Sequence, residues 1–361
     1  MINLTSLLWN NLCARIGLII ISVFFLAALF APLLSQYAPD KRTGNPHEYP
    51  SFIVKSAQAN PNSWVTKYLA DDRRTLLLSK KAEHVLGTSR MGRDIWAQVL
   101  HGARISLSVG FGAGMTVCIL ATVIGISSGY FGGRVDDCLS VLMNIMLVIP
   151  QYPLLFVIAA FIGEAGPLTI AIMIGCTSWA WGARIIRSQT LALRRKEFIR
   201  AAEVIGEHPA RIIFIEIFPN LIPIVGASFI GSVMYAIGME SIISFLGLGD
   251  PNTISWGIML YNVQTTSSML IGAWWEVLVP CLALSILITG LALLNFAVDE
   301  IANPQLRSSK RLRKKRKQKE LLQETDLKKC SEIELDVYFT NKTALLLNSE
   351  RRHACPIVLN S

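Results

Sequence analysis

The chain has 361 residues, of which 52% are hydrophobic and only 16% charged, and its mean hydropathy is +0.46. One soluble core does not need that much apolar surface, so the composition excludes an ordinary soluble domain and indicates an integral membrane protein. The formal net charge of +9 suits both nucleic-acid binders and the cytoplasmic loops of membrane proteins, so its location must decide. The seven cysteines are scattered without a CxxC pair or a Cys/His cluster, which predicts neither a disulfide framework nor a metal site.

Six apolar stretches are candidate transmembrane helices. At 1.5 Å per residue the first reaches roughly 28 Å, about the thickness of the hydrocarbon core. A cleaved signal peptide is the alternative, but its apolar core would hold only about 7 to 15 residues, so we expect an uncleaved span. The predicted fold class is therefore all-α, a polytopic membrane protein with about six transmembrane helices. The stretches are Ile16–Leu34, Ile105–Tyr130, Leu139–Ile162, Leu168–Ala183, Leu221–Leu246 and Trp275–Val298.

Polar segments divide the chain into four parts. Residues 1–35 hold the N-terminus and the first span, and residues 36–104 form a loop long enough to fold partly by itself. Residues 105–307 contain the other five spans, and residues 308–361 form a basic tail that we expect to be flexible. Between Arg307 and Lys319 nine of thirteen residues are Lys or Arg, and each cation near anionic lipid contributes roughly 1 kcal/mol. We expect contact with membrane lipid here and no nucleic acid, because no aromatic residue interleaves the run.

The basic residues of the short loops predict the orientation, because Lys and Arg are retained on the cytoplasmic side. The loop after the fourth span carries seven of them, whereas the segment from Gly247 to Ala273 carries none. Both termini are therefore predicted to be cytoplasmic and the 36–104 loop external. The seven are Arg184, Arg187, Arg194, Arg195, Lys196, Arg200 and Arg211.

The loop at 184–220 contains the stretch RAAEVIGEHPARIIFIEIFP. Ala201 and Ala202 are small residues in a helical pattern, Gly206 interrupts it, and Pro219 is expected to close the segment where the fifth span begins. The pattern predicts a short helix, a turn and a second helix at the inner membrane surface. Small side chains let another protein's backbone come close. An interfacial amphipathic hairpin is the alternative.

This stretch resembles the EAA loop of permease subunits in binding-protein-dependent ABC importers, whose pattern is EAA, three residues, Gly, and a hydrophobic helix ending near Leu-x-Pro. Three further stretches resemble the dipeptide, oligopeptide and nickel branch of that family, over about Leu86 to Arg307. They are HVLGTSRMGRDIWAQVLHGARISLSVG, GYFGGRVDD and ESIISFLGLGDPNTISWGIML.

The resemblance implies the type I permease fold of ABC importers and assigns a coupling loop. Ala201, Ala202, Gly206 and Pro219 match its pattern, and Glu203 lies beside them. Three residues depart from the pattern: Arg200 stands in place of the usual Glu, Glu216 in place of a hydrophobic residue or His, and Phe218 in place of Leu. In the external motif Ser89 replaces the usual acid. Arg200 and Glu203, three residues apart, could pair within the helix.

A family member of this kind would be one transmembrane half of an importer in the inner membrane of a bacterium or archaeon. It would pair with a second permease, dock on cytoplasmic ATPase subunits and receive substrate from an extracytoplasmic binding protein. The sequence contains no G-x-x-x-x-G-K-[ST] loop, so ATP hydrolysis is expected in another chain, and we predict neither catalytic residues nor a cofactor. Short peptides are the expected cargo, with nickel, metal chelates or other small solutes as the alternative.

Two other classes are weighed against this interpretation. An ion-coupled secondary transporter needs ionisable groups deep in its spans, and Glu240 is the one clear candidate. An intramembrane enzyme needs a catalytic pair or metal ligands, and none of the five histidines falls in a predicted span. Glu240 and Pro150, a helix-kinking residue, are instead candidates for a gate or pore, and Glu240 is expected to face the pore or the second permease.

Overall fold

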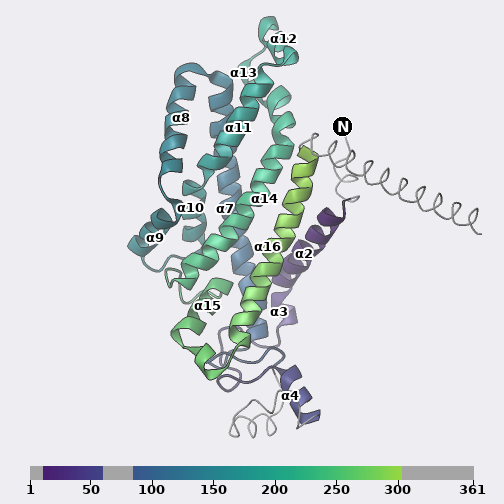
Figure 1. The fold of residues 1–361 in the computed structure, drawn as a ribbon, viewed down its shortest axis with the longest axis vertical. Helices are drawn as coiled ribbons and strands as arrows, with labels where there is room; N and C mark the ends of the chain where they lie inside the picture. The colour runs from purple at the N-terminus through teal and green to yellow at the C-terminus, as the bar shows by residue number, and fades with distance from the viewer. Residues whose placement is uncertain (1–10, 60–83, 303–361) are drawn as a thin grey trace, which may run out of the picture. The chain divides into compact units, whose positions relative to one another are not determined.

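The computed structural model describes residues 11–59 and 84–302 (Figure 1). The predicted flexible tail at 308–361, the first ten residues and part of the 36–104 loop lie outside the described residues. Within the described ranges the regular elements are helical, and the β pairing is limited to two isolated bridges. This confirms the prediction of an all-α chain.

The helices follow one another with short connections after residue 94. Those before it are α2 (Leu12–Leu29), α3 (Ala31–Leu34) and α4 (Ser51–Ala59). Those after it are α7 (Ile95–Phe131), α8 (Gly133–Val148), α9 (Gln151–Ile162), α10 (Pro167–Thr177), α11 (Trp179–Arg194), α12 (Glu197–Ile205), α13 (Pro209–Arg211), the π-helix η1 (Ile212–Ile217), α14 (Phe218–Phe245), α15 (Trp256–Thr265), the 3₁₀ helix η2 (Ser268–Ile271) and α16 (Trp275–Ala302).

Four helical runs are long and apolar enough to cross a membrane, and the number rises to six if each of two bent helix pairs counts as one span. The prediction of about six spans agrees with this. Two helices extend beyond the predicted spans. The helix α7 begins at Ile95, ten residues before the predicted start of the second span, because the Asp94 carboxylate caps it by accepting the Ala97 N–H at 2.9 Å. The fifth span extends back to Pro209.

The two bent pairs have different causes. The helices α8 and α9 meet at 81° next to Pro150, where the proline cannot donate a helical hydrogen bond, so the expected kink in the third span is confirmed. The helices α10 and α11 meet at 41° at Ser178. No proline marks this second break, and the sequence pattern predicted one continuous span there.

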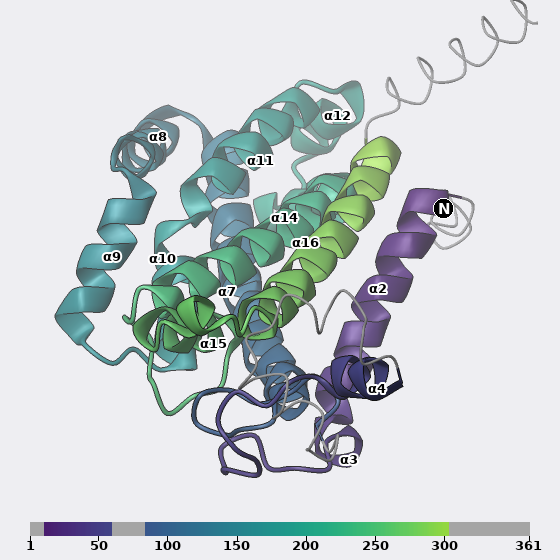
Figure 2. The same cartoon turned by 60° about the horizontal axis from the view of Figure 1, so that its bottom comes forward.

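The long helix α7 is the centre of the bundle, between α14 and the α10–α11 pair in both views (Figures 1 and 2). Two glycine pairs permit the close approach. A Cβ on Gly110 or Gly114 would meet Ile237 or Val233 of α14 at 2.3–2.5 Å. A Cβ on Gly125 or Gly129 would meet α11 at 2.6–2.7 Å. Each pair is four residues apart and so lies on one helix face, the arrangement that lets membrane helices pack by backbone contact.

The same device joins the first and last spans. A Cβ on Gly17 of α2 would lie 2.6 Å from the Gly290 carbonyl oxygen of α16. The helices α2, α7, α14, α15 and α16 also share a hydrophobic core that includes Trp256, which is fully buried. The first span is therefore packed against the later spans through specific small-residue contacts.

Candidate coupling loop and enclosed polar sites

The predicted coupling loop forms a compact turn that projects from one end of the bundle (Figure 1). The helix α12 ends at Gly206, which has φ +84°, a conformation that costs glycine little. The Gly206 N–H donates to the Glu203 carbonyl at 3.1 Å, and the Glu207 N–H donates to the Ala202 carbonyl at 3.1 Å. This pair of hydrogen bonds is a Schellman motif, so the turn has a defined shape before any partner binds.

One face of α12 anchors the turn and the other is exposed. Ile199 is fully buried, and Ala202 packs beside it against a core shared with α11 and η1. Ala201 is exposed, and Val204 and Ile205 at the tip are 89% and 79% exposed. The tip therefore offers small and apolar side chains that nothing among the described residues covers.

The charges at the tip are arranged differently from the prediction. Glu203 pairs with Arg194 of α11 at 3.6 Å, and the guanidinium of Arg194 also lies 5.5 Å from the centre of the Tyr130 ring. Arg200 is exposed and forms no ion pair with any described residue, so the expected pair with Glu203 is absent. Across the turn Glu207 pairs with Arg211.

The base of the loop carries an ion pair that the sequence analysis missed. Arg187 of α11 donates through Nε and Nη2 to both carboxylate oxygens of Asp136, at 2.6 and 2.7 Å. The Ser128 hydroxyl of α7 donates to the same carboxylate at 2.5 Å. Asp136 belongs to the quoted stretch GYFGGRVDD, so the motif identified the region, but the bidentate partner depends on how α8 and α11 pack.

The segment after the turn does not end at Pro219. The helix begins at Pro209, passes through the π-helical turn of η1, and continues into α14 as one run of 37 residues. Pro219 directly follows the wider π-helical turn of η1, in which the Phe218 N–H donates to the Ile213 carbonyl, and the run continues through the proline. The prediction that it closes the second helix was therefore wrong.

The carboxyl of Glu240 is enclosed within this chain. The residue is 2% exposed and accepts hydrogen bonds from Ser106 of α7 at 3.1 Å and from Ser244 of α14 at 3.0 Å. Ser241 donates to it at 3.4 Å. The expectation that Glu240 faces the pore or a second permease is corrected, because hydroxyls of its own chain fill the positions around it. Pro150, by contrast, is exposed at the bend between α8 and α9.

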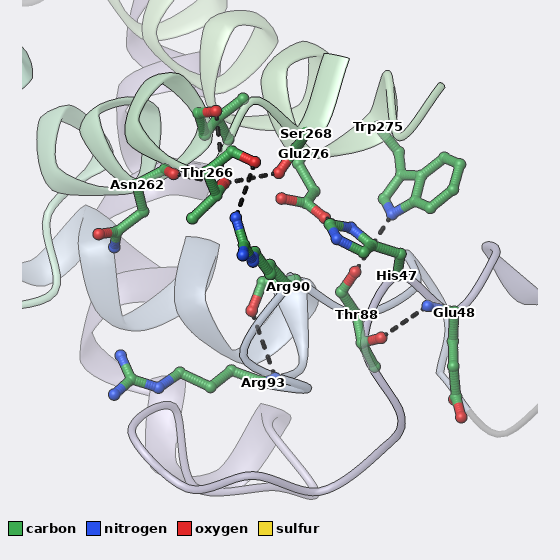
Figure 3. Close-up of polar contacts among 12 residues, drawn as sticks. His47, Glu48, Thr88, Arg90, Arg93, Asn262, Thr266, Ser268, Trp275 and Glu276 are labelled. Carbon is green, nitrogen blue, oxygen red and sulfur yellow. Dashed lines mark hydrogen bonds and ion pairs between the residues drawn. The ribbon is translucent and has the colours of Figure 1, made fainter. Parts of the chain in front are cut away.

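At the end remote from α12, the predicted external loop is fastened to the start of α16 (Figure 3). The His47 Nδ1 lies 2.7 Å from Oε1 of Glu276, a buried carboxyl. The Trp275 indole N–H donates to the Thr88 carbonyl at 3.4 Å, and an Arg90 guanidinium N–H donates to the Thr266 carbonyl at 3.0 Å. These contacts join residues 176 to 229 positions apart in the sequence, so the loop and the α15–α16 connection form one cap.

Ser89, which stands where the family usually has an acid, has a local role in this cap. Its hydroxyl accepts the Arg93 N–H at 3.3 Å within the turn that precedes α7. A hydroxyl oxygen is enough to satisfy that amide. The turn therefore forms without an anion at this position.

A bundle of membrane-crossing helices with a shaped turn projecting from one end defines a polytopic membrane protein. Residues 121–308 match the family described as "Binding-protein-dependent transport system inner membrane component", and residues 8–51 match "N-terminal TM domain of oligopeptide transport permease C". The chain belongs to this family of binding-protein-dependent inner-membrane transport components. The second match adds the first span to a resemblance that the motifs carried only from Leu86 onwards.

Individual relatives agree with the family. The chain is 32% identical to the "Dipeptide transport system permease protein DppC" of Alkalihalophilus pseudofirmus, over 83% of this chain and 88% of the relative. It is 33% identical to the "Oligopeptide transport system permease protein OppC" of Escherichia coli K12, over 73% and 78%. A solved structure of the MetNI methionine ABC transporter aligns with 58% of this chain and 95% of its own, at 18% identity and a TM-score of 0.47. Membership confirms the predicted permease family and the multi-pass membrane location.

Proposed function

We propose that the chain is the permease subunit of an ATP-driven importer of short peptides. The relatives named above are dipeptide and oligopeptide permeases, which supports peptides over nickel or metal chelates as cargo. A second permease would complete the translocation path, and a binding protein would deliver the substrate. The membrane is the inner membrane of a bacterium or archaeon.

The α12 turn is the site where this permease docks on a separate ATPase subunit. One observation carries this assignment: Val204 and Ile205 are almost fully exposed at the tip of a turn whose backbone is already fixed by the Schellman hydrogen bonds. An apolar tip of defined shape suits insertion into a cleft, because little ordering entropy remains to be lost on binding. Arg200, unpaired among the described residues, is placed to meet an acidic group of the ATPase.

This assignment implies an orientation in the membrane. The α12 end is cytoplasmic, as the seven basic residues of the 184–220 loop also predict. The cap that contains His47 and Glu276 then faces outward, towards the binding protein. Pro150 lies between the two ends, where bending of the third span would act on a gate.

The test is a charge placed at the tip in the complete transporter, co-expressed with its ATPase, second permease and binding protein. Gly206→Asp suits this, because a Cβ at Gly206 would meet nothing within 4 Å and Asp tolerates a left-handed backbone better than most residues. We expect the variant to insert and to pair with the second permease, yet to lose the ATPase on co-purification and to import no peptide. Ala201→Asp, which places the charge on the exposed face of α12, should behave alike.

Thr265→Asp is the matched control, because it adds the same charge to an exposed position at the opposite end of the bundle. It should retain the ATPase. Normal ATPase recovery and normal peptide uptake by Gly206→Asp would show that the turn is an ordinary surface hairpin.

A further inference from the structure

The breaks in the two bent helix pairs lie against each other and are joined by side chains. Gln151, the first residue of α9, donates from Nε2 to the Thr177 carbonyl at the end of α10, at 3.3 Å. The Tyr235 hydroxyl of α14 donates to Oε1 of the same Gln151 at 3.2 Å. Three helices therefore meet at one carboxamide, and both views show α9, α10 and α14 as neighbours (Figures 1 and 2).

The break also leaves polar groups with spare capacity. The Ser178 hydroxyl is buried beside Tyr235, but it has no hydrogen-bond partner of good geometry among the described residues. Gln151, Thr177 and Tyr235 are each half-buried, and Tyr152 next to them is 52% exposed. The cluster is thus reachable from outside the chain on one side.

The cluster lies near the middle of the membrane. Thr177 and Tyr235, which hold Gln151 between them, are each ten residues from the end of their helix that is remote from α12. At 1.5 Å per residue this is about 15 Å, half the thickness of the hydrocarbon core. Lipid cannot supply hydrogen bonds at that depth, and interrupted helices are tolerated there only where they are buried in protein or line a water-filled cavity. The reachable side of the cluster therefore faces either another protein chain or a polar path.

We propose that Gln151, Thr177, Ser178 and Tyr235 form a contact site for the backbone amides of the peptide substrate on its path across the membrane. A peptide bond offers one N–H donor and one carbonyl acceptor, the same pair as the Gln151 carboxamide. When the Gln151 carboxamide turns away from the Thr177 carbonyl and the Tyr235 hydroxyl, it can donate to the carbonyl of a passing peptide bond and accept from its N–H, while the freed Tyr235 hydroxyl can accept a second N–H. This inference rests on the proposed peptide import and adds residues and a ligand group to it.

The composition of the cluster selects the ligand group. None of its four members is charged, so it has no counter-ion for a peptide terminus and no carboxylate or imidazole for a metal. Backbone amides are common to all peptides, whereas side chains differ. A site that reads only amides would pass peptides of varied sequence, and selection among them would belong to the binding protein.

The alternative is that Gln151 only holds the two breaks together. The experiment compares uptake of radiolabelled trialanine with uptake of its analogue in which an ester oxygen replaces one amide N–H, in cells that carry the complete transporter. The same binding protein serves every variant, so any change in the amide-to-ester uptake ratio arises in the permease. Gln151→Leu keeps the size of the side chain and removes its hydrogen bonds.

We expect Gln151→Leu to lower trialanine uptake by about fivefold, the effect of one ordinary hydrogen bond, and to lower ester uptake much less, so that the uptake ratio falls. Tyr235→Phe should change the ratio in the same direction. Thr289→Val is the control, because Thr289 is exposed on α16 and its hydroxyl bonds only to the Ser285 carbonyl of its own helix.

The outcomes separate the two proposals. Equal loss of both substrates in Gln151→Leu, or no loss of either, would show a structural tie and overturn the amide site while leaving peptide import standing. Absence of trialanine uptake by the unmodified transporter would overturn the proposed function itself and the amide site with it.

Discussion

The tip of α12 and the surroundings of Glu240 reverse the usual placement of side chains. At the tip, Val204 and Ile205 are apolar and exposed outside the membrane-crossing part of the chain, while Glu240 is a carboxyl enclosed within it. The tip has a fixed backbone and uncovered side chains, whereas Glu240 has its hydrogen bonds satisfied by its own chain. The comparison shows that polarity alone does not reveal what a side chain does. Exposed apolar side chains such as Val204 are available to a partner, whereas an enclosed carboxyl such as Glu240 stabilises the subunit itself.

The largest effect on the stability of the subunit is expected from Glu240→Ala. The change leaves a cavity and removes the acceptor of the Ser106 and Ser244 hydroxyls, so the free energy of unfolding should fall by about 3 kcal/mol. Unfolding in mixed micelles of increasing SDS content measures this. Glu240→Gln retains a carbonyl acceptor and is the control. An unchanged unfolding curve for Glu240→Ala would contradict the enclosed site.

A smaller effect is expected at the base of the loop. Arg187→Met removes the two hydrogen bonds to Asp136 but keeps an apolar stem against α8, so the loss should be about 1.5 kcal/mol. Arg187→Lys can replace only part of the bidentate contact, so its free energy of unfolding should lie between those of Arg187→Met and the unmodified chain. Equal stability of Arg187→Met and the unmodified chain, measured in the same micelles, would show that the pair contributes nothing.

The smallest effect on stability is expected at the tip itself. Replacing Val204 and Ile205 together by Ser removes side chains that touch little of this chain, so the free energy of unfolding should change by less than about 0.5 kcal/mol. Binding of the ATPase should nevertheless weaken by more than about tenfold, because each side chain would lose its burial in the partner. A large stability loss, or unchanged ATPase affinity, would remove the contrast between the tip and Glu240.

Local patterns in the sequence predicted what depends on a few neighbouring residues. The spans followed from apolar length, the turn at Gly206 from the need for a left-handed backbone, and the bend near Pro150 from the missing proline N–H. The break at Ser178 was missed because no proline or glycine marks it. The partners of Glu240 could not be predicted either, because Ser106 lies 134 residues away and meets Glu240 only after α7 packs on α14.

The error at Pro219 has a physical reason of the same kind. Proline in the interior of a regular α-helix usually kinks or ends it. Here the π-helical turn of η1 comes directly before Pro219, and the helical run continues through it. The proline is visible in the sequence, but the π-helical turn before it could not be predicted from the sequence pattern.

The unbroken run from Pro209 to Phe245 makes α13, η1 and α14 a single lever. Its 37 residues span about 55 Å at 1.5 Å per residue, with the α12 turn at one end and Tyr235 and Glu240 towards the other. A tilt of only 5° about the middle of such a rod would move each end by about 2 Å, close to the scale of one hydrogen bond. A π-helical turn has looser hydrogen bonding than the helix around it, so η1 is the point where this long helix would bend first when the α12 turn moves.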